Sequence, residues 1–427
     1  MTRWIDADGA ACLLESGMTV FVAGATAEPR EILEALARHA DRCAEVRFVS
    51  VSIPGLNAVD FTALHPQAKS TAFFATRTNR VSVAEGRTDF LPLQYRAIYD
   101  YLEHDLEIDV AILQLPPAGE DGNFSVGIGA DFAPAVLEKA GLVIGEINSR
   151  QPAPADAPTL PPAKLDFAVA CERPVPTLPA AKLSETVRAI GGHVADLIRD
   201  GDCMQIGMGA IPDATLGALA GKNDLGFHSG MIANGVMALA RAGNLTGSKK
   251  TLDAGKIVTG ATLGDQALID WAGETSTLAF RPVGYTHDIG VTRRVDNFVS
   301  INSALQVDLF GQVNSDMLDG RQVSGTGGSV DMMRGAALSR GGRSIIALKA
   351  TAAGGNISCI VSALPPQHAT TALRTDVDYV VTEYGARRIR HLSWQARAEA
   401  LIEIAAPQFR DTLRDEWRDL AGGQSAS

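Results

Sequence analysis

The chain has 427 residues, of which 46% are hydrophobic and 20% are charged, and this balance excludes a disordered protein. Lysine and arginine number 38 against 49 aspartate and glutamate residues, which gives a formal net charge of −11. A protein that binds duplex nucleic acid needs a basic face, so nucleic acid is not an expected partner. A small anion bound at a locally basic site is compatible with this charge.

Five widely spaced cysteines form no Cys-x-x-Cys pair and no Cys/His cluster. The spacing therefore predicts neither a disulfide framework nor a zinc site, and we expect no metal and a reducing, cytoplasmic location. The first nine residues carry acids and no apolar core, unlike a secretion signal. No stretch approaches 18 uncharged apolar residues, so we expect no membrane partner.

Short apolar runs alternate with helical patterns along the first half of the chain. The runs predict strands at Thr19–Val22, 46–51, Val110–Leu115 and 142–147. Helical spacing of apolar residues predicts helices over 29–39 and 133–140, the first with a proline in its first turn. Strand–helix alternation of this kind is typical of parallel sheets covered on both faces.

Prolines concentrate between residues 151 and 182, which predicts an extended connector at the end of a first domain. We place the domains at 1–182 and 183–427, the second opening with a helix over 183–199. Each half begins with a turn, a strand, a loop of small residues and a proline at a helix start. This weak repeat predicts an α/β fold of two similar open, mainly parallel domains that face each other around a cleft.

Glycine-rich loops precede two predicted helices in the second half. The first loop, 207–213, follows a strand, so its backbone N–H groups suit a phosphate, a thioester oxygen or a carboxylate. Pro212 stands where a dinucleotide fingerprint needs its third glycine, which disfavours a nicotinamide cofactor. The second loop, 324–331, lets backbone approach a ligand closely, and 353–356 is a candidate third wall. Each loop is also compatible with a plain structural turn.

His228 and Ser229 stand side by side after a strand-like run. No Gly-x-Ser-x-Gly elbow surrounds the serine, so we interpret His228 as a loop or packing residue.

Several segments in fixed order together resemble one family. They are Gly207–Asp213, His228–Gly235, Ser300–Ser303 with Gln306–Asp308, 324–331 and 380–385, preceded by 84–87 and followed by 406–409. In this set the chain resembles the acetyl-CoA hydrolase/4-hydroxybutyrate CoA-transferase group of class I CoA-transferases, over nearly its whole length.

The resemblance implies an acyl-CoA:carboxylate CoA-transferase. An enzyme carboxylate would form an acyl anhydride and then an enzyme–CoA thioester, so that coenzyme A is a substrate and no cofactor is needed. It also implies small carboxylic acids as partners and a homo-oligomer, a dimer or tetramer. Residues that would contact CoA are Gly207, Met208, Gly209, Ala210, Ile211, Gly325, Gly327 and Gly328. From its place beside the 353–356 loop, Lys349 is our candidate for the CoA phosphates.

The sequence departs from the family where the nucleophile belongs. The family's catalytic glutamate sits in a His-Ser/Thr-Glu-Met loop, and here that position is Gly230. A second departure is Cys359, where a basic residue is common. We expect another acid to replace the glutamate from the facing domain, either Asp60, in a loop at a strand's carboxyl end, or Glu28, ionised at a helix start. The alternatives are an acyl-CoA hydrolase that activates water and a non-catalytic CoA binder.

Overall fold

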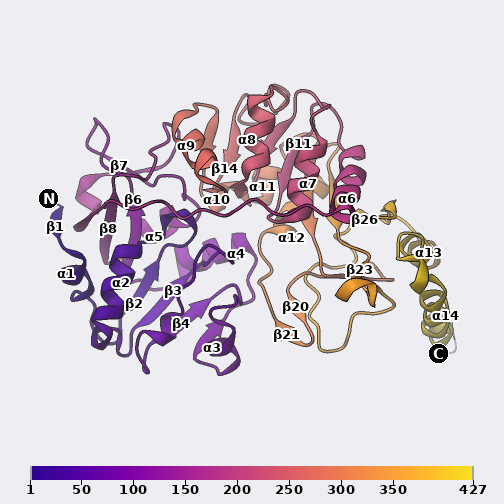
Figure 1. Ribbon diagram of the computed structural model, residues 1–427, viewed down its shortest axis with the longest axis horizontal. Coiled ribbons are helices and arrows are strands. Elements are labelled where there is room, and N and C mark those ends of the chain that lie inside the picture. Colours follow the sequence, from indigo (N-terminus) through magenta and orange to yellow (C-terminus); the bar gives the residue numbers. More distant parts are fainter. Residues whose placement is uncertain (1, 426–427) are drawn as a thin grey trace.

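The computed structural model describes residues 2–425, and two eight-stranded sheets dominate it. The two halves lie side by side, with the last helices at the far end of the second half (Figure 1). In spatial order the first sheet contains β1 (Arg3–Ile5), β10 (Phe167–Cys171), β8 (Leu142–Asn148), β6 (Val110–Leu115), β2 (Thr19–Val22), β3 (Arg47–Ser50), β4 (Lys69–Ala72) and β5 (Thr88–Phe90).

The second sheet repeats this arrangement. In spatial order it contains β16 (Leu278–Phe280), β14 (Ile257–Thr259), β12 (Gly226–His228), β11 (Cys203–Ile206), β17 (Phe298–Ser303), β22 (Arg343–Ala347), β26 (Tyr379–Thr382) and β27 (Gly385–Arg388). In each sheet the first central strand, β2 or β11, has the next strand of the chain on one side and a later strand on the other. All pairs are parallel except β26 with β27, which confirms the predicted pair of similar, mainly parallel α/β domains.

Helices connect and cover the strands, and several short strands form small side sheets. The helices are α1 (Ala7–Ala11), α2 (Arg30–Arg38), α3 (Arg80–Ala84), α4 (Tyr95–Asp100), α5 (Ala133–Leu137), α6 (Glu185–Asp196), α7 (Ala210–Ala218), α8 (Asn234–Arg241), α9 (Gln266–Glu274), α10 (Val283–Thr286), α11 (Ile289–Thr292), α12 (Ser329–Leu338), α13 (Trp394–Glu403) and α14 (Arg410–Ser425). The side-sheet strands are β7 (Phe124–Ser125), β9 (Thr159–Leu160), β13 (Met231–Ile232), β15 (Ala261–Thr262), β18 (Gln306–Asp308), β19 (Val313–Asn314), β20 (Met317–Leu318), β21 (Arg321–Gln322), β23 (Thr351–Ala352), β24 (Ile357–Ser358) and β25 (Ile360–Val361).

Local sequence explains the elements that hold the first domain together. All six residues of β6 are buried, as a parallel strand covered on both faces requires. Helix α2 follows Pro29 and buries Ile32, Leu33 and Leu36 at helical spacing against that sheet. One apolar cluster contains Phe73 of the first half together with Phe227 and Phe280 of the second, so the two domains share a core.

The proline-rich stretch is only in part a connector. Strand β10 lies within it and occupies an inner position of the first sheet, between β1 and β8. Residues 172–184 alone run as irregular backbone from β10 to Ser184, whose hydroxyl caps α6. Among residues 2–425, no helix has the length and apolarity that crossing a bilayer demands.

Candidate active site

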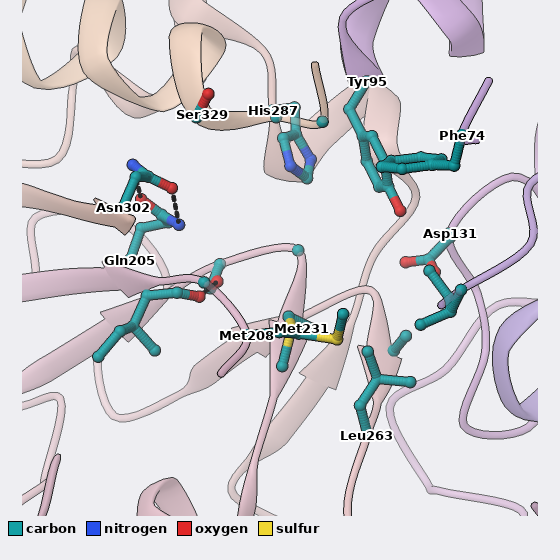
Figure 2. Close-up of a pocket in the computed structure, with 18 of the residues that line it drawn as sticks. Phe74, Tyr95, Asp131, Gln205, Met208, Met231, Leu263, His287, Asn302 and Ser329 are labelled. Atoms are coloured by element: carbon teal, nitrogen blue, oxygen red, sulfur yellow. Dashed lines mark hydrogen bonds between the residues drawn. The ribbon is translucent and has the colours of Figure 1, made fainter. Parts of the chain in front are cut away.

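A cavity of about 170 Å³ opens between the two domains and is lined by Gly207, Gly230, Gly327 and Gly328, four of the glycines that the sequence singled out. The first domain contributes Ile53, Pro54, Phe74, Tyr95 and Asp131 to its wall. The second domain contributes Gln205, Ile206, Gly207, Met208, Ser229, Gly230, Met231, Ala261, Leu263, His287, Asn302, Gly327, Gly328 and Ser329. Figure 2 shows Asp131 and His287 facing the same space from different sides.

The loops after β11 and β12 reach this cavity because these parallel strands end at the same edge of the second sheet. Gly207 and Met208 directly follow β11, and Gly209 begins α7 with a φ of 117°, a value that favours glycine. Gly230 comes two residues after β12, and Gly328 precedes α12. Three backbone segments with little side-chain cover therefore converge on one space.

Asp131 reaches the cavity by a direct backbone connection between the domains. Thr262 N–H donates to the Ile128 carbonyl at 3.0 Å, and Ala130 N–H donates to the Gly260 carbonyl at 2.8 Å. The N–H groups of Gly260 and Ala261 both donate to the Gly230 carbonyl, at 3.1 and 3.0 Å. The Asp131 segment is thus linked to Gly230 through residues 260–262, although Asp131 and Gly230 are 99 positions apart in the sequence.

The carboxyl group of Asp131 is buried, and the structure gives it no side-chain hydrogen bond among the described residues. Asp131 is 8% exposed, and its Oδ1 has no hydrogen-bond partner among residues 2–425. Burial raises the pKa of Asp131 to about 7, because no nearby cation offsets the loss of water. The Tyr95 side chain lies between Asp131 and His287 in Figure 2. Near neutral pH this carboxyl group is therefore present in both its acid and its carboxylate form.

His287 fills the space beside Gly230. A Cβ built on Gly230 would lie 3.0 Å from Nε2 of His287 and closer still to Cε1, and a Cβ on Gly328 would also approach Nε2 too closely. Nδ1 lies 2.9 Å from the Thr286 hydroxyl, and the ring centroid lies 5.0 Å from that of Tyr95. Burial lowers the pKa of His287 to about 3, so the imidazole is neutral.

A second cavity of about 350 Å³ continues from the first. The two share Met208, Met231 and Leu263, and the second is also lined by Gly209 and the connector residues 178–181. The start of α7 therefore faces a channel that leads from the outer wall to Gly230.

The structure brings together most, but not all, of the residues predicted to contact CoA. Gly207, Met208, Gly327 and Gly328 line the first cavity and Gly209 lines the second. Ala210 and Ile211 form the first turn of α7. Gly325 instead packs against the Phe73 carbonyl of the first domain. Lys349 is exposed and lines neither cavity, and the 353–356 loop, the candidate third wall, is likewise outside both.

The structure places neither of the two predicted acids in the cavity. Asp60 caps a short turn, where its Oδ1 accepts from the Thr62 N–H at 3.0 Å and from the Thr62 hydroxyl at 2.7 Å. Only Ile53 and Pro54 of its loop reach the cavity wall. This loop end meets the cavity, as parallel-sheet geometry predicts, but Asp60 sits too far along it.

Glu28 is buried beneath the wall and is paired with Arg30 at 2.9 Å. Burial raises the pKa of Glu28, and the hydrogen bond and charge of Arg30 act against that shift. His228 is fully buried, with Nε2 3.2 Å from the Thr286 carbonyl, which agrees with its interpretation as a packing residue.

Asp131, His287, Tyr95 and Phe74 are among the cavity residues that the sequence did not identify. The one local signal for Asp131 is its position after two glycines in 127–131, a segment that passes close to another backbone. His287 has no comparable signal, since it follows an ordinary short helical pattern.

Comparisons with known proteins show what the whole chain is similar to. Residues 2–179 match the family model "Acetyl-CoA hydrolase/transferase N-terminal domain", and residues 264–417 match the corresponding C-terminal domain. The chain is 37% identical to the 4-hydroxybutyrate coenzyme A transferase of Clostridium kluyveri, over 97% of each protein. The solved 4-hydroxybutyrate CoA-transferase of Porphyromonas gingivalis is 32% identical, with a TM-score of 0.82 over 98% of this chain and 97% of its own. An acetyl-CoA hydrolase of Neurospora crassa is more distant, at 24% identity over 76% of this chain and 69% of its own.

Proposed function

Because the chain belongs to the acetyl-CoA hydrolase/transferase family and is an enzyme of its CoA-transferase class, we propose that it transfers CoA between small carboxylic acids with Asp131 as the attacking carboxylate. The observation that carries the proposal is the buried carboxyl group of Asp131, a residue that lines the same cavity as Gly207, Gly230 and Gly328 and whose Oδ1 has no hydrogen-bond partner among residues 2–425. Among the residues that line this cavity, Asp131 is the sole carboxylic acid.

The proposed reaction consists of two exchanges at carbonyl carbons. A carboxylate oxygen of Asp131 attacks the thioester carbon, a C–O bond forms, and the C–S bond breaks to release the CoA thiolate. The thiolate then attacks the Asp131 carbonyl carbon of the anhydride and displaces the acyl group as a free carboxylate. An acceptor acid repeats both steps in reverse on the resulting enzyme–CoA thioester. No water and no net proton transfer are required.

Burial supports this role for Asp131 in two ways. A carboxylate that has lost its water is a stronger nucleophile than one that remains hydrated, and Asp131 is 8% exposed. The apolar wall formed by Ile53, Phe74 and Leu263 also limits water, which would hydrolyse an anhydride. The first feature favours formation of the anhydride, and the second favours transfer to a carboxylic acid over hydrolysis.

The second cavity is the proposed path of the CoA arm. It leads from the connector residues 178–181 past Gly209 and Met208 to Gly230, which would bring a thioester from outside to Asp131. The first turn of α7, with Ala210 and Ile211, would direct N–H groups toward it. Roles for Gly325 and Lys349 in CoA binding stay predictions, since neither lines this path.

The size of the inner cavity supports small acyl groups. About 170 Å³ suits a short aliphatic or dicarboxylic acid, and the wall offers no lysine or arginine to hold a second carboxylate deep inside. We propose short monocarboxylic acids as the first substrates to test. The cytoplasmic location and the homo-oligomeric state predicted above also remain proposals.

Isotope exchange tests the reaction directly. Purified protein is incubated with labelled acetate and a panel of acyl-CoA esters from acetyl-CoA to butyryl-CoA, and label in the CoA ester pool is measured. We expect exchange by the natural protein and by Asp60→Asn, and a loss of about a thousandfold or more in Asp131→Asn. Exchange by Asp131→Asn at the natural rate would overturn the assignment. Release of free CoA that is independent of acceptor, without exchange, would show hydrolysis instead.

A further inference from the structure

The His287 ring forms part of the wall of the candidate site. It lies against Gly230 on one side and Gly328 on the other, so closely that neither position has room for a Cβ. The ring lines the cavity (Figure 2), and the residue is 5% exposed. Within residues 2–425, the side-chain hydrogen bonds of His287 involve Nδ1 and leave Nε2 for a ligand.

The hydrogen bond at Nδ1 determines which ring nitrogen carries the proton. The Thr286 hydroxyl is fully buried, and Nδ1 is its hydrogen-bond partner at 2.9 Å. No other acceptor for this hydroxyl occurs among the described residues, so a satisfied hydroxyl must donate to Nδ1. The single proton of the neutral imidazole therefore lies on Nε2, which makes His287 a hydrogen-bond donor toward the cavity.

We propose that the Nε2–H of His287 donates a hydrogen bond to the carbonyl oxygen of the acyl-CoA thioester while Asp131 attacks its carbon, an inference that rests on the proposed function. As the new C–O bond forms, the carbonyl π electrons move to the oxygen, whose negative charge the donor stabilises. When the C–S bond breaks, the electrons return to restore the C=O bond. The ring keeps its proton throughout, so the step balances without an acid or a base.

The space left by Gly230 and Gly328 explains why an imidazole fits this task here. A side chain on either glycine would displace the ring, and both lie on loops that also meet the proposed thioester path. A role for His287 as a general base disagrees with the proton assignment, because the nitrogen that faces the cavity is already protonated. His287 thus acts by a directed N–H, in the part of the site where the family's glutamate side chain is absent.

Two substitutions of similar size separate a chemical role from a structural one. His287→Leu fills the volume but has no donor, whereas His287→Gln places an amide N–H near the position of Nε2. Steady-state exchange is measured for both variants, and their folded state is checked by thermal unfolding. We expect His287→Leu to lower kcat by about a hundredfold with little change in KM, and His287→Gln to recover most of that loss.

The outcomes distinguish this inference from the proposed function. If the natural protein exchanges label and Asp131→Asn does not, but His287→Leu is as active as the natural protein, the role of His287 is wrong and that of Asp131 stands. Equal losses in the Leu and Gln variants, or a loss confined to KM, would also overturn the donor role. If the natural protein shows no exchange at all, the proposed function fails first.

Discussion

Gly260 leaves the space in which the carboxyl group of Asp131 lies. A Cβ built on Gly260 would meet Oδ1 of Asp131 well inside van der Waals contact, and it would lie 2.9 Å from the carbonyl oxygen of Gly230. The backbone of Gly260 also links Ala130, the neighbour of Asp131, to Gly230. Its carbonyl accepts from the Ala130 N–H, and its own N–H donates to the Gly230 carbonyl. Gly260 therefore sets the position of Asp131, the proposed nucleophile, relative to the Gly230 loop, in which the family's catalytic glutamate is absent.

A methyl group at this position should displace the carboxyl group. We expect Gly260→Ala to lower the exchange rate by about a hundredfold, because a displacement of about 1 Å at the reacting atom has effects of this size. Gly192→Ala is the matched control, since a Cβ at that helical glycine meets nothing within 4 Å. A Gly260→Ala protein that is folded and exchanges label at the natural rate would contradict the placement of Asp131.

The family's glutamate can be restored at residue 230 only if His287 makes room. We expect Gly230→Glu alone to be inactive and less stable, by about 1–3 kcal/mol from overpacking against the ring. Gly230→Glu combined with His287→Gly should recover the lost stability and regain exchange through the new carboxylate. Urea unfolding and isotope exchange measure the two effects separately. Equal destabilisation in the single and the double variant would show that the ring and residue 230 do not compete for space.

The exchange rate should rise with pH through about 7, the pKa of buried Asp131, because the carboxylate and not the acid attacks the thioester. Below that pH the rate should fall by about tenfold per unit, and above it the rate should level off. The half-reaction with acyl-CoA alone, followed by thiolate release, measures this directly. His287→Gln should show the same profile, because the imidazole stays neutral over this range.

The same ionisation should affect stability with the opposite sign. The folded-state pKa of Asp131 lies above the ordinary value of 3.8, so the folded protein holds this proton more tightly than the unfolded chain. Its contribution to stability is greatest below about pH 4 and is lost as the pH rises through 7. Relative to Asp131→Asn, the natural protein should therefore become less stable between about pH 4 and pH 7, with no further change above about pH 8. A constant difference across that range would argue against the raised pKa.

The buried ion pair between Arg343 and Asp202 should stabilise the second domain against unfolding. The Arg343 guanidinium pairs with the Asp202 carboxylate and donates to the Leu197 carbonyl at 3.0 and 3.1 Å, and both side chains are almost fully buried. Arg343→Met leaves the acid buried without its cation, so we expect a loss of about 3–5 kcal/mol in the free energy of unfolding. The double variant with Asp202→Asn should recover part of the loss. If the single variant unfolds at the natural urea concentration, the pair does not stabilise the fold.

Local patterns in the sequence were sufficient to predict the architecture. The all-buried run of β6 and the proline that precedes α2 are short-range signals, and both elements form where expected. The repeated opening of the two halves anticipated the shared strand order of the two sheets. The family and its CoA-transferase class, which the ordered motifs predicted, are also confirmed.

The proposed reacting groups were not predictable in the same way. Asp131 is held near Gly230 because residues 128–130 pair with residues 260–262. No local sequence pattern predicts this long-range pairing. The His287 ring fits in the cavity wall because Gly230 and Gly328, which are distant in sequence, have no side chains there. Asp60 was a reasonable choice by strand position, but the turn that it caps directs its carboxylate to Thr62. Long-range packing thus decides which acid reaches the cavity.

Capture of the enzyme–CoA thioester shows directly whether Asp131 is the carboxylate that attacks the acyl-CoA. The protein is incubated with acyl-CoA and treated with borohydride, which reduces an aspartyl thioester to the alcohol, and the modified peptide is identified by mass spectrometry. We expect homoserine in place of aspartate at residue 131, and no homoserine there when acyl-CoA is omitted. Modification at Asp60, Glu28 or any other carboxylate, with residue 131 unchanged in a protein that exchanges label, would contradict it.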